Sequence, residues 1–149
     1  MSEKKALPPT YLVSSIIAMP ILHFLCPVSR VIHFPWNLLG IAPLSIGIVL
    51  NLAADKAFKQ KGTTVKPFEE SIALITTGVF RISRHPMYMG MALILLGIAV
   101  LLGSLTPYVI IPVFVILMEV VFIREEERML EEKFGRVWLA YKKKARRWI

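Results

Sequence analysis

Long runs without charged residues are the feature that most constrains this chain. Residues 6–29 and 31–54 hold no Asp, Glu, Lys or Arg, and residues 85–123 hold only Glu119. A transmembrane helix needs about 20 mostly apolar residues, within a range of roughly 17–25. Residues 103–107, Gly-Ser-Leu-Thr-Pro, are typical of a tight turn that divides the longest run in two. The pattern therefore predicts an all-α polytopic membrane protein with four transmembrane helices.

Composition excludes several other classes of protein. Of the 149 residues, 56% are hydrophobic and 19% are charged, whereas a soluble domain carries roughly a quarter charged residues. A single cysteine, Cys26, rules out an intramolecular disulfide. One cysteine and three scattered histidines leave no ligand set for a structural zinc ion, so no metal site is expected.

The basic residues predict the orientation of the chain in the membrane. All but one of the 18 lysines and arginines, Arg30, lie in the N-terminus, the middle segment or the C-terminal tail. The positive-inside rule places these three segments on the cytoplasmic side, so both termini are expected to be cytoplasmic. The net charge of +8 then reflects contact with anionic membrane lipids. No motif that reads bases is present, and nucleic acid is not an expected partner.

These expectations divide a single domain, residues 1–149, into spans and cytoplasmic segments. The predicted spans are about 8–29, 35–54, 86–104 and 107–124, the cytoplasmic loop is 55–85, and the C-terminal cytoplasmic helical extension is 125–149. A cleavable signal peptide is the alternative for the first span, but Pro20 interrupts the apolar run and no small-residue cleavage site follows. Gly40 and Gly47 offer places for close helix contact in the second span. In the extension Gly135 is the one weak point, and Trp138, Tyr141 and Trp148 suit a membrane interface.

One polar cluster lies where the cytoplasmic loop meets the third span. Arg81, Arg84 and His85 supply donors, and the start of the helix at Pro86 adds unpaired backbone N–H groups. Tyr88 follows one turn later. Such a helix start favours a ligand that carries a carboxylate. The alternative is an interfacial anchor, in which the arginines contact lipid headgroups and the tyrosine belongs to the aromatic belt.

A second cluster, Glu119 with Glu125, Glu126 and Glu127, lies where the fourth span ends. An acidic residue inside a membrane segment is a candidate for function. Glu119 and Glu126 are seven positions apart, which puts them on the same face of an α-helix, and we expect that face to point into the bundle. For Glu125 and Glu127 we favour a solvated ladder of charges with the neighbouring arginines.

The two clusters together resemble the isoprenylcysteine carboxyl methyltransferases and the related phospholipid methyltransferases. The first motif comprises Gly78, Phe80 and the run Arg84-His85-Pro86-Met87-Tyr88-Met89-Gly90. The second comprises Glu126-Glu127-Arg128-Met129-Leu130, Phe134-Gly135, Trp138 and Tyr141. The resemblance covers roughly residues 63–149. It implies an integral-membrane methyltransferase that uses S-adenosylmethionine as cofactor.

The resemblance also assigns residues to the site. It implies a cofactor pocket lined by Leu74, Ile75, Phe80, Arg84, His85, Pro86, Met87, Tyr88, Gly90 and Glu126. Prenylcysteine enzymes of the family often have Tyr in place of Phe80, and an arginine that contacts substrate where this chain has Phe122. Arg124 is the arginine present nearby. The expected catalytic residues are Glu126, Arg124 and Glu119.

The expected activity is methyl transfer to a lipophilic acceptor, either an isoprenylcysteine-like carboxylate or a lipid-like small molecule. Positioning is the main demand of such a displacement, and a carboxylate nucleophile needs no general base. An amine acceptor would need one, with Glu119, Glu126 or Glu127 as candidates. We therefore favour O-methylation over N-methylation. The alternatives are a small four-helix transporter with Glu119 as its ion site, or a noncatalytic membrane adaptor.

Overall fold

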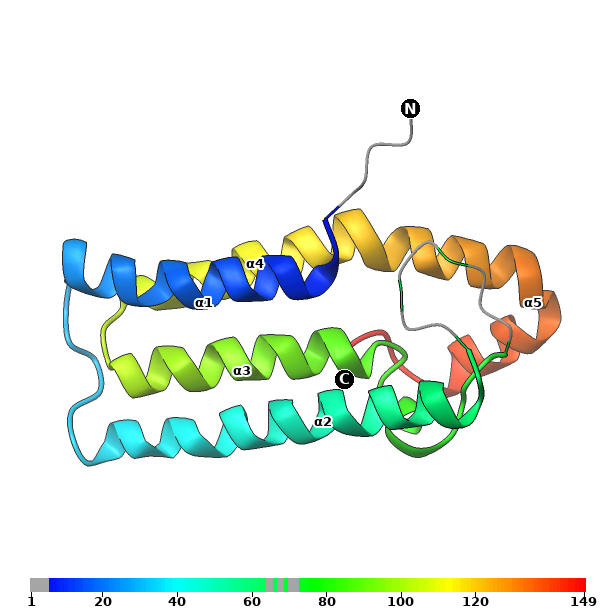
Figure 1. Ribbon diagram of the computed structural model, residues 1–149, viewed down its shortest axis with the longest axis horizontal. Coiled ribbons are helices and arrows are strands. Elements are labelled where there is room, and N and C mark those ends of the chain that lie inside the picture. The colour runs from blue at the N-terminus through cyan, green and yellow to red at the C-terminus, as the bar shows by residue number, and fades with distance from the viewer. Residues whose placement is uncertain (1–5, 64–65, 67–68, 70–72) are drawn as a thin grey trace.

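A computed structural model describes residues 6–63, 66, 69 and 73–149 of the chain. Lys4, Lys5 and parts of the predicted cytoplasmic loop (residues 64–65, 67–68 and 70–72) lie outside the described residues. The α-helices are α1 (Pro8–Leu25), α2 (Ile41–Gln60), α3 (Pro86–Leu102), α4 (Ile110–Met118) and α5 (Arg124–Lys144). They run along the long axis of an elongated bundle (Figure 1). Apart from two isolated bridges, the described part of the chain has no β-structure, which confirms the all-α class.

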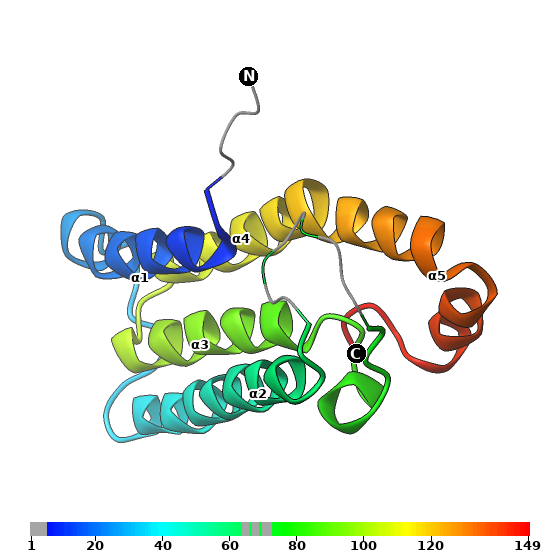
Figure 2. The ribbon, with the colours of Figure 1, turned by 45° about the vertical axis from the view of Figure 1, so that its right-hand side comes forward.

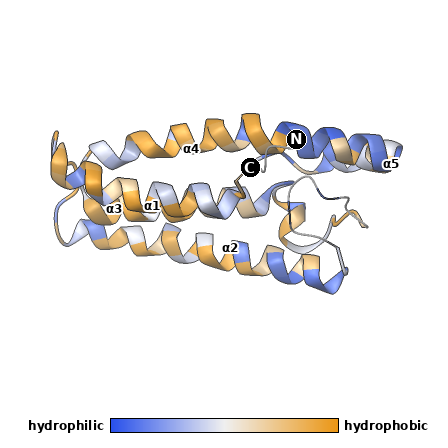
Figure 3. Ribbon diagram, turned by 45° about the horizontal axis from the view of Figure 1, so that its top comes forward, coloured by the Kyte–Doolittle hydropathy of each residue, from blue (hydrophilic) through white to orange (hydrophobic). Residues whose placement is uncertain are grey.

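The bundle has an apolar exterior, as a membrane protein requires. Within the described residues, three helical stretches are long and apolar enough to cross a membrane, namely Pro8–Leu25, Trp36–Gln60 and Thr106–Lys144, and α3 is a shorter apolar helix of 17 residues. Large side chains such as Ile17 and Val49 are more than half exposed, at 55% and 63%. Figure 3 shows hydrophobic residues along the bundle and hydrophilic residues on α5. Four spans remain a prediction, because α3 is at the lower limit of length.

The helices differ in extent from the predicted spans for local reasons. The first ends at Leu25 rather than near residue 29, because Pro27 follows and cannot continue a helix. The second continues to Gln60, beyond the predicted end at residue 54, since its last turns are polar but contain no helix breaker. The third ends at Leu102, where Gly103 adopts a positive φ of 72°.

Glycines allow α2 and α3 to pack with their backbones in contact. A Cβ atom on Gly47 would lie 2.4 Å from the carbonyl oxygen of Gly90, and one on Gly40 would lie 2.4 Å from that of Gly97. No side chain fits at such distances, and small residues are typical of close helix contacts in membranes. The predicted role of Gly40 and Gly47 is confirmed.

Helices α4 and α5 form one continuous rod as far as Gly135, where the rod bends. A π-helical turn, Glu119–Ile123, joins them and carries the chain without a break past the apolar segment, as the sequence predicts. At Gly135, φ is 48° and ψ is −118°, which is not helical, and the rod bends sharply there. The C-terminal end then returns to the start of α3 (Figure 2), where the backbone N–H of Arg84 donates to the carbonyl of Arg146. This return closes one side of the site described next.

Candidate functional site

A cavity of about 580 Å³ opens where α3 begins, between the start of α1, the end of α2 and α5. Pockets of roughly 300–1,000 Å³ are usual for small molecules and cofactors. Apolar and aromatic side chains dominate its lining. The predicted cofactor residues among them are Leu74, Ile75, Phe80, Arg84, His85, Pro86, Met87, Tyr88 and Glu126. The fold therefore gathers these residues around one space, and their roles remain predictions.

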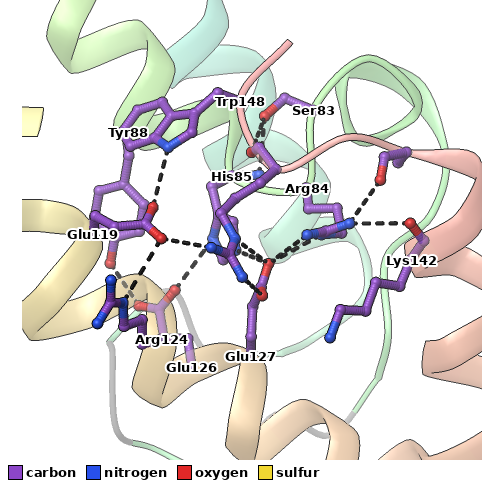
Figure 4. Close-up of polar contacts among 12 residues, drawn as sticks. Ser83, Arg84, His85, Tyr88, Glu119, Arg124, Glu126, Glu127, Lys142 and Trp148 are labelled. Carbon is purple, nitrogen blue, oxygen red and sulfur yellow. Dashed lines mark hydrogen bonds and ion pairs between the residues drawn. The ribbon is translucent and has the colours of Figure 1, made fainter.

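The imidazole of His85 is the centre of the polar part of this cavity. Its Nδ1 lies 3.5 Å from Oε2 of Glu126, and its Nε2 lies 3.3 Å from Oε1 of Glu127. Tyr88 donates its hydroxyl to Oε1 of Glu126 at 2.5 Å. Figure 4 shows Glu126 and Glu127 of α5 facing His85, with Tyr88 of α3 beside Glu126. The two polar clusters of the sequence thus meet in space.

Glu127 is buried, so the prediction that it belongs to a solvated ladder is wrong. Only 4% of the residue is exposed. Its Oε1 accepts hydrogen bonds from Nε and Nη2 of Arg84, at 3.0 and 2.8 Å, and its Oε2 accepts one from Nη2 of Arg147 at 2.6 Å. Glu125 differs, because it is only partly buried and pairs with the exposed Arg128 on the helix surface. The prediction holds for Glu125 alone.

The π-helical turn explains why Glu127 rather than Glu126 aligns with Glu119. A π-turn holds one more residue than an α-turn, so residues eight apart share the face that residues seven apart would share in a regular helix. Arg147 accordingly reaches both Glu119 and Glu127 at 2.6 Å. Glu126 turns toward His85 instead. The prediction that Glu119 and Glu126 share one face is therefore wrong.

Three predicted site residues lie away from the described cavity lining. Glu119 accepts hydrogen bonds from Arg147 and from the indole N–H of Trp148, the latter at 3.1 Å. Arg124 has a side chain 67% exposed, and its Nε is 4.0 Å from Glu119. Gly90 packs against Gly47 in the α2–α3 contact. Glu119, which the transporter alternative needs as an ion site, is thus paired within the chain.

Arg84 lines the cavity, but most of its donors are committed elsewhere. Besides the two hydrogen bonds to Glu127, its Nη1 donates to the carbonyls of Lys142 and Ala145 at 3.1 and 2.9 Å. A guanidinium has five N–H donors. Arg84 therefore fastens the C-terminal segment to the start of α3, and little of it is left for a ligand.

The charges around His85 and Arg147 affect their ionisation. Burial would lower the pKa of His85, but the hydrogen bonds and negative charges of Glu126 and Glu127 outweigh burial and hold the pKa above its ordinary value of 6.5. The hydrogen bond from Arg147 to Glu127 raises the pKa of that guanidinium further. His85 therefore carries a proton over a wider range of pH than a free histidine.

Trp138 and Tyr141 are core residues, which contradicts the prediction that they suit a membrane interface. They are 1% and 7% exposed, and the Tyr141 hydroxyl donates to the carbonyl of Phe80 at 2.6 Å. Both line the cavity, as does Phe58. The bend at Gly135 turns this part of α5 back against the end of α2, which no periodicity in the sequence reveals.

The fold matches that of a known integral-membrane methyltransferase. The structure of the eukaryotic intramembrane Ras methyltransferase ICMT, an isoprenylcysteine carboxyl methyltransferase, aligns with a TM-score of 0.68 and 25% sequence identity. The match covers 95% of this chain and 51% of that one, so the chain spans about half the length of the solved structure. The shared part is thus a membrane methyltransferase fold.

A family model identifies the chain more closely. The model of the phospholipid methyltransferases matches residues 36–137, which is more than half of the sequence, and the chain belongs to this family. An uncharacterized protein of Haemophilus influenzae is 36% identical over 63 residues, which are 42% of this chain and the whole of that protein. These matches confirm the family resemblance that the sequence motifs indicated.

Proposed function

We propose that the protein transfers a methyl group from S-adenosylmethionine to a lipophilic acceptor at the cytoplasmic face of a membrane. The observation that carries the proposal is the cavity where His85, Tyr88 and Glu126 meet an apolar lining. It lies at one end of an apolar bundle, so an acceptor dissolved in the bilayer can reach a site that also holds polar groups. Membership of a methyltransferase family supports the reaction type.

The residues of the cavity suit a nucleoside that carries charged groups. The side chain of Glu126 is 21% exposed and can accept hydrogen bonds from an ammonium group. The indole N–H of Trp138, beside the cavity, is buried and has no hydrogen-bond partner among the described residues. A buried donor without a partner costs about 1–3 kcal/mol, and a bound ligand can remove that cost. Aromatic residues such as Phe80 and Phe58 offer faces for a purine ring.

Catalysis in this proposal depends on positioning. S-adenosylmethionine, when bound, supplies an electrophilic methyl group on a sulfonium centre. Glu126, Tyr88 and His85 hold the polar end of the cofactor, and Leu74, Ile75 and Phe80 exclude water from the rest. Holding two reactants in line can supply several kcal/mol of barrier lowering. Glu119 and Arg124 lie outside the cavity lining and act, in this proposal, through the residues they contact.

The acceptor we propose carries an oxygen nucleophile, such as the carboxylate of a prenylated cysteine, attached to an apolar chain. A deprotonated carboxylate reacts without a general base. A lipid amine is the second candidate, favoured by the family and by the carboxylate of Glu126, which can receive the proton released on N-methylation. Phe122, where the related prenylcysteine enzymes have an arginine, is wholly buried against Tyr11 and Tyr88.

An assay with a labelled methyl donor tests the proposal. Purified protein in lipid nanodiscs is incubated with S-adenosylmethionine labelled in the methyl group, and the label is followed into total membrane lipids, prenylcysteines and long-chain amines. Base-labile label in the organic phase supports an ester product, and base-stable label supports a methylated amine. Absence of transfer, together with absence of S-adenosylhomocysteine binding, would overturn the proposed function.

A further inference from the structure

Glu127 contacts three cationic or ionisable side chains but does not belong to the described lining of the cavity. Its carboxylate is bound by Arg84, by Arg147 and by Nε2 of His85, at 2.8, 2.6 and 3.3 Å. The side chain is 6% exposed. A ligand in the cavity meets His85 and Glu126 instead. Glu127 can therefore affect a ligand only through its neighbours.

The contacts of Glu127 fix the ring of His85 in one orientation. An imidazole has two nitrogens, and here one faces Glu127 while the other faces Glu126 in the cavity. Arg84 and Arg147 hold the Glu127 carboxylate in turn, so it cannot rotate away from the ring. A buried carboxylate needs such partners, because loss of one leaves an uncompensated charge.

We infer that Glu127 is a positioning residue that orients the imidazole of His85 toward Glu126, and that Arg147 holds the Glu127 carboxylate and partly compensates its negative charge. The inference rests on the proposed function only in that His85 lines the cavity assigned to the methyl donor. Arg147 belongs to the C-terminal segment, so the last residues of the chain become part of the site.

The groups that face His85 make the inference testable through its ionisation. They are Glu126 and Glu127 of α5, Tyr88 of α3, and Arg84, which directly precedes His85 in the sequence. Arg147 lies behind Glu127 and pairs with it. Removing the charge of Glu127 lowers the pKa of His85, because one negative neighbour is lost. Removing the charge of Arg147 raises it, because the charge of Glu127 is then less compensated. A general loosening of the fold does not shift the pKa in opposite directions.

The experiment is a pH titration of protein with isotopically labelled histidine, followed by NMR in detergent micelles without any ligand. The H85N variant assigns the His85 signal, and His23 and His33 serve as internal references. We expect E127Q to lower the pKa of His85 by about one pH unit or more, R147Q to raise it, and E125Q, at an exposed ion pair on the same helix, to leave it unchanged.

Two results would overturn the inference: an unchanged His85 titration in E127Q, or shifts of the same sign in E127Q and R147Q. If E127Q does not fold, R147Q alone decides, because a fall in the pKa contradicts the inference and a rise supports it. Binding of S-adenosylhomocysteine to the wild type is measured separately. A wild type that binds none, with the expected titrations, would contradict the proposed function and leave the positioning role intact.

Discussion

The hydroxyl of Tyr88 donates a hydrogen bond of 2.5 Å to the carboxylate of Glu126, although 38 positions separate the two residues. Tyr88 lies in the first turn of α3, and Glu126 lies in the first turn of α5. The two residues belong to different sequence motifs, and only the folded bundle brings them together. This contact is the reason for treating both motifs as parts of a single site.

Substituting Glu126 tests that site directly. We expect E126Q to weaken binding of S-adenosylhomocysteine by roughly 10–100-fold, because a hydrogen bond to a charged group contributes about 1.5–3 kcal/mol. Isothermal titration calorimetry in detergent measures the change. E131Q is the matched control, since Glu131 is an exposed residue on the same helix that pairs with Lys142. Equal affinity in E126Q and wild type would refute the assignment of Glu126.

The raised pKa of His85 predicts how stability depends on pH. A histidine whose pKa is higher in the folded than in the unfolded state stabilises the fold fully below its unfolded pKa, about 6.5. This stabilisation is lost as the pH rises through the folded pKa. We therefore expect the melting temperature of the wild type to fall with rising pH over this window, and that of H85Q to fall less. A melting temperature of the wild type that rises relative to that of H85Q as the pH increases would contradict the ion pairs of His85.

The general fold was predictable because membrane helices leave a strong signal in the sequence. Long charge-free runs locate the helices, and Gly47 in α2 and Gly40 directly before it mark the contact with α3. The ends of the helices were less predictable, since polar residues continue a helix as readily as apolar ones do. Thus α2 continues to Gln60, well past the apolar run.

The site was predictable only as far as its motifs remained local. His85, Tyr88 and Glu126 were singled out from sequence, and they meet in the structure. The π-helical turn was not visible, so the seven-residue spacing of Glu119 and Glu126 was misleading. Glu127 and Arg147 were missed as partners because their contact depends on the bend at Gly135. No spacing or periodicity encodes a contact made by such a return of the chain.

The glycine contact between α2 and α3 predicts a cost for any side chain there. A methyl group at position 47 would lie 2.4 Å from the carbonyl oxygen of Gly90, so G47A must push the helices apart. Overpacking of this kind costs about 1–3 kcal/mol, and we expect a lower melting temperature in detergent. V49A is the control, because Val49 is 63% exposed on the same helix. Comparable stability of G47A and V49A would argue against the close contact.

The bend at Gly135 predicts that a substitution at this position can detach the C-terminal segment from the site without changing any residue of the site itself. Its φ of 48° with ψ of −118° suits glycine alone, and other residues pay about 1–3 kcal/mol in such strained conformations. We expect G135A to destabilise the bend and to weaken the contacts of Arg147 and Trp148 with Glu119. Thermal unfolding and limited proteolysis measure the effect, with faster cleavage after the five lysines and arginines of residues 142–147. R136A, at the exposed neighbouring position, serves as the control. If G135A resists protease as well as R136A does, the bend does not hold the C-terminal segment in place.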